Sequence, residues 1–288
     1  MKEFKDKVAV ITGAASGIGY GLAERCAQEG MKVVLADVEE GALAQAEKNI
    51  NALGAATLAV KTDVSRADDV KALAEKTLGT FGAVHLLFNN AGVGGIVTDV
   101  WEYSLADWKW MLNVNLWGVI HGIHYFVPIM LKQNTECHIV NTASAAGLFA
   151  YTGRVAYAVS KHGVVILSET LCHELKVKKP DIGVSVLCPG IIKTNIFKAS
   201  RNRPKELLNK PGEGMDMSDP QVQATLQTIR QALEKGMPPE QVADIVFETI
   251  KNRKFYIFAN AEETKHLIKT RMEDILQERN PTSISLEL

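Results

Sequence analysis

The sequence predicts an α/β protein built on a doubly wound, parallel sheet of about seven strands. Three observations support this prediction. Short apolar, β-branched runs alternate with helical stretches, and most of the connections between them are short. A glycine-rich turn joins the first run to the first helix. Polar motifs follow the ends of several runs, where a parallel sheet of this kind places its ligand crevice.

The strands and helices are expected in regular alternation along the chain. The first helix carries the apolar stripe Leu22, Ala23, Cys26 and Ala27, and another runs from Arg154 with no proline until Pro180. The expected strands lie at residues 8–12, 32–36, 57–61, 85–88, 137–142, 182–187 and 254–259, and the other helices at 39–53, 67–80, 105–131, 238–251 and 262–278.

The length and composition suit one large domain or two small ones. Hydrophobic residues make up 47% of the 288 residues and charged residues 23%, which provides for an ample core. No internal repeat or linker is visible, so we predict a single domain over residues 1–260. Within it, residues 191–237 are rich in basic residues, glycine and proline, and we expect a mobile cover over the crevice. Residues 261–288 are expected to form a C-terminal helix and a polar tail.

Charge and cysteine usage indicate a cytoplasmic protein that binds neither nucleic acid nor membrane. The net charge of −1 gives no reason to expect either partner. The start of the chain lacks the features of a signal peptide, and we expect no apolar run to reach the length of a membrane span. The cysteines lack C-x-x-C spacing and are predicted to be reduced core residues: Cys26, Cys137, Cys172 and Cys188.

The stretch from Thr12 to Gly19, TGAASGIG, has the context of a dinucleotide-binding loop. It follows an apolar strand and opens a helix, so glycines allow a pyrophosphate to approach the backbone at a helix N-terminus. Its spacing is G-x-x-x-G-x-G. Asp37 ends the second strand, twenty residues after Gly17, and an acid there typically binds ribose hydroxyls and repels a 2′-phosphate. This favours NAD over NADP, although Asp37 could instead cap the next helix.

A second motif combines Ser144, Tyr157 and Lys161. Tyr157 and Lys161 are four residues apart in a predicted helix, so their side chains share one face. A free tyrosine has a pKa of about 10, and a nearby cation favours its phenolate. Such a pair suits proton transfer at neutral pH, although the same spacing is common in helices without any chemical role.

Two asparagines, Asn113 and Asn115, lie inside the apolar helix predicted at 105–131. A buried asparagine is costly unless it is hydrogen-bonded, so these residues either hold backbone segments together or serve the active site. His121 and His124 lie on the same stretch. With no carboxylate at ligand spacing, they are expected to be packing or interface residues, and no metal site is predicted.

Taken together and in order, these motifs resemble the short-chain dehydrogenase/reductase family, from Lys7 to about Ala259. The resemblance implies a Rossmann-type dehydrogenase domain, and the departures, a longer segment before the last strand and an extra C-terminal helix, are peripheral. The matching elements are TGAASGIG, Asp37, Asp63, NNAG at 89–92, Asn115, Ser144, Tyr157-x-x-x-Lys161, and Pro189-Gly190 with Thr194.

The resemblance implies a role for each matching residue. Tyr157 would be the general acid or base, Ser144 would donate to the substrate oxygen, Lys161 would support Tyr157 and bind the nicotinamide ribose, and Asn115 would hold a water linking Lys161 to solvent. The implied cofactor-binding residues are Gly13, Ser16, Gly17, Ile18, Gly19, Asp37, Asp63, Val64, Asn90, Ala91, Gly92, Tyr157, Lys161, Pro189, Gly190, Ile192 and Thr194.

The family analogy also suggests the substrate wall. Beside Ser144 and Tyr157, its expected residues are Gly94, Gly95, Val97, Ala146, Phe149, Tyr151, Ile196 and Phe197. These are mainly apolar or aromatic, and no arginine among them could clamp a carboxylate or phosphate. The expected substrate is a bulky, hydrophobic secondary alcohol or ketone, of aryl, alicyclic or steroid-like type, although these side chains could instead only close the core.

Three alternatives remain at this point. An NADP-dependent carbonyl reductase would differ chiefly at Asp37. An enoyl reductase would carry its tyrosine further from the lysine. A non-catalytic nicotinamide sensor or scaffold would be expected to lose Tyr157 or Lys161, because fold alone does not establish activity. The family also implies a homodimer or homotetramer, paired through the helices that carry Asn115 and Tyr157.

Overall fold

Seven strands form one parallel sheet in the computed structural model, which describes residues 1–178, 180–260 and 262–283. The end of the predicted tail, residues 284–288, lies outside the described residues. The strand order is β3-β2-β1-β4-β5-β6-β7, and the bounds are β1 Val8–Thr12, β2 Lys32–Asp37, β3 Thr57–Lys61, β4 Leu86–Asn89, β5 Cys137–Thr142, β6 Ile182–Pro189 and β7 Tyr256–Ala259. The predicted fold class is confirmed, with strand ends shifted by one or two residues.

The strand order reverses between β1 and β4. The chain runs outward from β1 to β3, then returns to pair β4 with the other side of β1. This reversal is the switch point of a doubly wound sheet, and it opens a crevice at the carboxyl ends of the strands. The run Val8–Thr12 is buried throughout because helices cover both faces, which explains its continuous apolar character.

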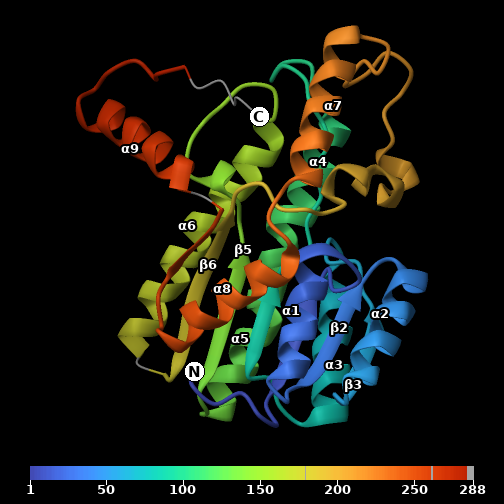
Figure 1. Cartoon of the computed structure of the whole chain (residues 1–288), viewed down its shortest axis with the longest axis vertical. Helices are drawn as coiled ribbons and strands as arrows, with labels where there is room; N and C mark the ends of the chain where they lie inside the picture. Colours follow the sequence, from blue (N-terminus) through green and yellow to red (C-terminus); the bar gives the residue numbers. More distant parts are fainter. Residues whose placement is uncertain (179, 261, 284–288) are drawn as a thin grey trace.

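Helices cover both faces of the sheet (Figure 1). On one face, α1 (Gly17–Gln28), α2 (Glu40–Ala52) and α8 (Pro239–Lys251) bury their apolar stripes in one core. On the other face, α3 (Ala67–Phe81), α5 (Gly118–Gln133) and α6 (Val155–Lys178) build a second core. The four cysteines are free thiols; Cys26, Cys137 and Cys188 are buried as predicted, whereas Cys172 is only half-buried and so is not a full core residue.

The single helix predicted at 105–131 is divided in the structure. It comprises α4 (Leu105–Leu112), a π-helical turn η1 (Asn113–Trp117) and α5. π-helical turns widen a helix locally and are frequent at functional sites. Here the turn contains Asn115, whose side chain bonds the backbone of Val93 after β4. Sequence periodicity could not show this interruption, because both flanking segments keep the helical apolar pattern.

One helical stretch among the described residues, 105–133, is long and apolar enough to cross a membrane by length and composition. This corrects the expectation that no apolar run reaches that length. Core helices of soluble proteins pass the same test, and this stretch supplies Trp110, Phe126 and Met130 to the interior. The predicted absence of a membrane partner stays a prediction.

The insertion at 191–237 lies over the carboxyl end of the sheet (Figure 1). Its base is closed by a parallel bridge between Ile192 and Met237. Inside it are η3 (Ile196–Asn202), η4 (Lys205–Leu207) and α7 (Pro220–Glu234). An ion pair of 2.6 Å between Arg203 and the buried Asp107 of α4 ties it to the body. The C-terminal helix α9 spans Glu262–Leu276, two residues shorter than predicted.

Candidate active site

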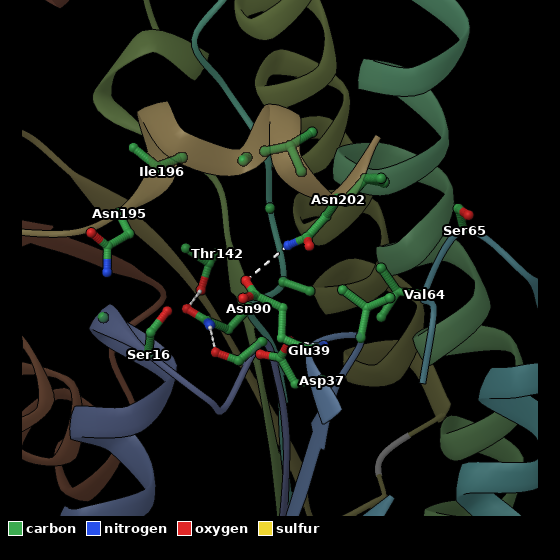
Figure 2. Close-up of a pocket in the computed structure, with 18 of the residues that line it drawn as sticks. Ser16, Asp37, Glu39, Val64, Ser65, Asn90, Thr142, Asn195, Ile196 and Asn202 are labelled. Atoms are coloured by element: carbon green, nitrogen blue, oxygen red, sulfur yellow. Dashed lines mark hydrogen bonds between the residues drawn. The ribbon is translucent and has the colours of Figure 1, made fainter. Parts of the chain in front are cut away.

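A cavity lies at the carboxyl ends of the central strands, under the insertion (Figure 2). Most residues predicted to bind the cofactor line it: Gly13, Ser16, Gly17, Ile18, Asp37, Asp63, Val64, Asn90, Ala91, Gly92, Tyr157, Lys161, Pro189 and Thr194. Gly190 and Ile192 line a neighbouring cavity that shares Tyr157 and Thr194 with the first. Gly19 lines neither of these two cavities.

The glycine turn after β1 is shaped by its lack of side chains. Gly13 has a φ of +67°, which favours glycine, and a Cβ on Gly19 would lie 2.1 Å from the carbonyl oxygen of Gly13. Thr12 Oγ1 accepts the backbone N–H groups of Asn90 and Ala91 at 2.9 and 3.1 Å, which joins this turn to the loop after β4. The side chain of Ser16 does not cap α1, so the first N–H groups of the helix remain available to an anion.

Asp37 is held rigidly at the end of β2. Its Oδ2 accepts the Ala15 N–H and its Oδ1 accepts the Glu39 N–H, both at 3.0 Å. Burial raises the pKa of Asp37, and these two backbone hydrogen bonds partly oppose that rise. Each carboxylate oxygen has a further lone pair, so both can also accept from a ligand hydroxyl. Nearby, His121 bonds the carbonyl of Val64 at 2.9 Å, which gives this histidine a packing role.

Tyr157 and Lys161 lie on the buried side of α6. The Lys161 Nζ is 5.7 Å from the centre of the Tyr157 ring and donates to the Thr142 carbonyl at 2.9 Å. Burial lowers the pKa of Lys161 to about 8. The ammonium is therefore a buried cation at neutral pH whose proton is easily released as the pH rises.

Ser144 follows β5 and caps a short 3-10 turn, η2 (Ala145–Gly147). Its Oγ accepts the Ala146 N–H at 3.2 Å. Because the hydroxyl is the acceptor in this bond, its proton can be donated to a ligand oxygen. Ser144 and Tyr157 both line the neighbouring cavity, so a hydroxyl donor and a phenol face one space.

Asn115 holds the loop after β4 in place. Its Oδ1 accepts the Val93 N–H at 2.8 Å, and its Nδ2 donates to the Val93 carbonyl at 3.0 Å and to Ser160 Oγ at 3.2 Å. A Cβ on Gly92 would lie 3.4 Å from Asn115 Oδ1 and 3.5 Å from Lys161 Nζ. The asparagine and the lysine therefore border the same glycine.

The predicted substrate wall is only partly brought together. Ser144, Tyr157, Ile196 and Phe197 line the neighbouring cavity, which we call the substrate cavity. Apart from Ile18 and Arg154, its other lining residues come from 189–194 and from α7, and they are mostly apolar. The remaining residues of the predicted wall are not among those that line either cavity: Gly94, Gly95, Val97, Ala146, Phe149 and Tyr151.

A family model described as short chain dehydrogenase matches residues 7–205. This range holds the glycine turn, Asp37, and the Ser144, Tyr157 and Lys161 group. The chain belongs to the short-chain dehydrogenase family.

Solved and characterised relatives agree with this assignment. A short chain dehydrogenase/reductase from Burkholderia phymatum, solved in complex with NAD, is 46% identical, has a TM-score of 0.93, and is matched over 99% of this chain and 100% of that one. A CLA biosynthesis dehydrogenase/reductase of Lactiplantibacillus plantarum is 34% identical over 98% of this chain and 97% of its own length. Cyclohexanol dehydrogenase of Acinetobacter sp. (strain SE19) is 41% identical over 68% of this chain and 76% of its own length. The neighbour's NAD complex supports a nicotinamide cofactor in this family member.

Sequence reasoning missed Arg154 of this short-chain dehydrogenase. No arginine was expected among the wall residues, yet Arg154 lines the substrate cavity. Its guanidinium lies 4.8 Å from the ring centres of both Tyr157 and Phe197. Its spacing could have indicated it, because Arg154 directly precedes α6 and lies three residues before Tyr157, so both side chains can face one side.

A second missed feature joins the insertion to the far end of the cofactor cavity. Glu39, two residues after Asp37, pairs with Arg201, and its Oε1 accepts from Asn202 Nδ2 at 2.8 Å (Figure 2). The pKa of Glu39 is lowered, chiefly by the hydrogen bond from Arg201. Residues separated by about 160 positions meet here, so no local pattern in the sequence indicated the contact.

Proposed function

We propose that this dehydrogenase interconverts a secondary alcohol and a ketone with NAD. The observation that carries the proposal is the position of Tyr157, which borders both the cofactor cavity and the substrate cavity. Lys161 faces it from the cofactor side and Ser144 from the substrate side. A proton-transferring group, a buried cation and a hydroxyl donor at one junction suit the removal of an alcohol proton.

Each residue then has a distinct part in the reaction. Tyr157 takes the hydroxyl proton during oxidation and returns it during reduction. Ser144 donates to the substrate oxygen and stabilises the negative charge that develops there. Lys161 supports the phenolate through its charge, and its lowered pKa suits onward transfer of the proton. Asn115 keeps the loop at Gly92 beside Lys161, and we propose that it supports the path by which that proton leaves.

The residues present fit a nicotinamide dinucleotide. The glycine turn packs so closely on itself and on the loop after β4 that a Cβ at Gly13 or Gly19 would clash with the backbone, and the first turn of α1 offers N–H groups to a pyrophosphate. Asp37 would accept the adenosine ribose hydroxyls, and Thr194 and Lys161 line the same cavity. When bound, the nicotinamide ring would supply the acceptor for the hydride that leaves the carbinol carbon.

Asp37 is expected to select NAD over NADP, because a carboxylate there accepts the ribose hydroxyls and repels a 2′-phosphate. The variant Asp37→Ala should lower the preference for NAD, expressed as the ratio of kcat/KM values for the two cofactors, by about 10- to 100-fold, the loss expected for a hydrogen bond to a charged group. Steady-state kinetics with each cofactor measure this ratio. Asp68→Ala, on the exposed side of α3, is the matched control. An unchanged ratio in Asp37→Ala would remove the basis for proposing NAD.

The apolar lining of the substrate cavity favours a hydrophobic substrate. The decisive test follows the absorbance of reduced nicotinamide while a panel of secondary alcohols, from small linear to aryl and alicyclic compounds, is offered with NAD. We expect turnover chiefly on the bulky members. Turnover confined to small alcohols would contradict the substrate class. No turnover on any member, with NADH still bound, would favour a substrate outside the panel or a nicotinamide sensor.

We also propose a cytoplasmic homodimer or homotetramer. Trp117 of η1 is 49% exposed, and Val159 and Ile166 of α6 are 45% and 60% exposed. Val159 and Ile166 are seven residues apart and therefore lie on one helix face, beside η1. Exposed apolar side chains gathered on neighbouring helices are typical of a subunit interface.

A further inference from the structure

Arg154 occupies an unusual position in the substrate cavity. Its guanidinium stacks on the ring of Tyr157 and on that of Phe197, so an aromatic side chain from α6 and one from the insertion both contact it. A Cβ on Gly94 would lie 3.8 Å from Arg154 Nη2, which places the guanidinium against the loop after β4 as well. These contacts hold the cation at the cavity that also contains Ser144.

The charge of Arg154 has no carboxylate partner within the described part of the chain. Its Nε is buried and makes no hydrogen bond there. Arg203 differs in its carboxylate partner: its Nε is also without a hydrogen bond there and it also stacks on an aromatic ring, that of Trp110 at 5.2 Å, but it pairs with Asp107 at 2.6 Å. A guanidinium presents five N–H donors in a planar fork that matches a carboxylate. Arg154 therefore keeps its donors for a group that enters the cavity.

Tyr151 lies close enough to Arg154 to be affected by its charge, and its hydroxyl also lacks a hydrogen-bond partner in the part of the chain that the structure describes. Its hydroxyl is buried and makes no hydrogen bond among the described residues. Burial raises the pKa of Tyr151 to about 12, and the charge of Arg154 opposes that rise. Tyr151 is therefore neutral and adds no negative charge beside Arg154, and its hydroxyl does not line the substrate cavity. The charge of Arg154 is thus left for an anion that enters the cavity.

We propose that Arg154 binds a carboxylate of the substrate, so that the alcohol or ketone is a hydrophobic hydroxy acid or oxo acid. This inference rests on the proposed function, because Arg154 would hold the carboxylate near the carbon whose oxygen contacts Tyr157 and Ser144. A single arginine in apolar surroundings balances the one charge of a carboxylate, whereas the near-double charge of a phosphate monoester would remain partly unpaired. Arg154 is then a specificity-determining residue, and the apolar lining receives the body of the acid.

The test compares hydroxy acids with their methyl esters, with the spacing between hydroxyl and carboxyl varied. Wild-type protein should oxidise the acid with the higher kcat/KM. In Arg154→Met the ratio of acid to ester kcat/KM should fall by about 10- to 100-fold, mostly through the KM of the acid, since a charge-assisted hydrogen bond is lost. Arg154→Lys should retain part of the preference. Arg230→Met, an exposed arginine of α7, is the control and should leave the ratio unchanged.

Several outcomes would overturn the inference. An equal fall for acid and ester would show that Arg154 only positions Tyr157, and a wild-type preference for the ester or for an alkyl phosphate would exclude a carboxylate site. Binding is measured separately, with a saturated fatty acid and its methyl ester added to protein saturated with NADH. If no hydroxy acid is oxidised but Arg154→Met still weakens binding of the acid alone, the carboxylate site stands and the proposed reaction fails. Equal binding of acid and ester by wild-type protein would overturn the site.

Discussion

Replacing Tyr157 with phenylalanine is expected to lower kcat for alcohol oxidation by about 10²- to 10⁴-fold, the range typical of a lost general acid or base. The ring stays in place, because its packing against Arg154 and its neighbours in the cavity core does not involve the hydroxyl. NADH binding should therefore remain close to that of the wild type. Stopped-flow or steady-state absorbance measures kcat, and NADH fluorescence measures binding.

Tyr20→Phe is the matched control for this experiment. Tyr20 accepts a hydrogen bond from Asn49 at 3.3 Å and does not line either cavity, so its hydroxyl should not affect kcat. If Tyr157→Phe kept more than about a tenth of the wild-type kcat, a loss below the range for acid–base catalysis, proton transfer would have to be assigned elsewhere.

Replacing Lys161 with methionine is expected to abolish most activity and to change how stability depends on pH. Burial lowers the pKa of Lys161 from 10.5 in its ordinary state to about 8 in the folded protein. Below pH 8 Lys161 is protonated in both the folded and the unfolded state, so the full cost of burying the cation lowers the free energy of unfolding. Between pH 8 and 10.5 the unfolded state binds more protons, so the free energy of unfolding gains a contribution that rises with pH.

The size of this contribution is at most about 3 kcal/mol, from a pKa difference of about 2.5 units. Lys161→Met should remove this pH-dependent contribution. Near pH 7 the variant should have a higher free energy of unfolding, because no cation is buried. The gain is reduced by about 1 kcal/mol because the hydrogen bond to Thr142 is lost. Urea denaturation of cofactor-free protein at several pH values measures the difference between wild type and variant. Lys176→Met, on the exposed side of the same helix, is the control. Parallel pH profiles for wild type and Lys161→Met would contradict the lowered pKa.

Much of the fold was predictable because its signals are local. Continuous β-branched runs such as Val8–Thr12 indicate strands covered on both faces, and their alternation with amphipathic helices leaves few topologies. The main error in the predicted secondary structure also concerned a short segment. The π-helical turn Asn113–Trp117 was predicted as part of one helix, because a single wider turn leaves the apolar periodicity on either side intact.

By itself, the sequence determined the doubly wound fold, the glycine turn, the acid at the end of β2 and the order of Ser144, Tyr157 and Lys161. Each depends on neighbours in the chain or on the rule that parallel strands end at one edge. Only the tertiary structure decided that Arg154 stacks between Tyr157 and Phe197, and that Glu39 meets Arg201. These contacts depend on how the insertion folds back over the sheet, and long-range packing of an irregular segment leaves no periodic pattern in the sequence.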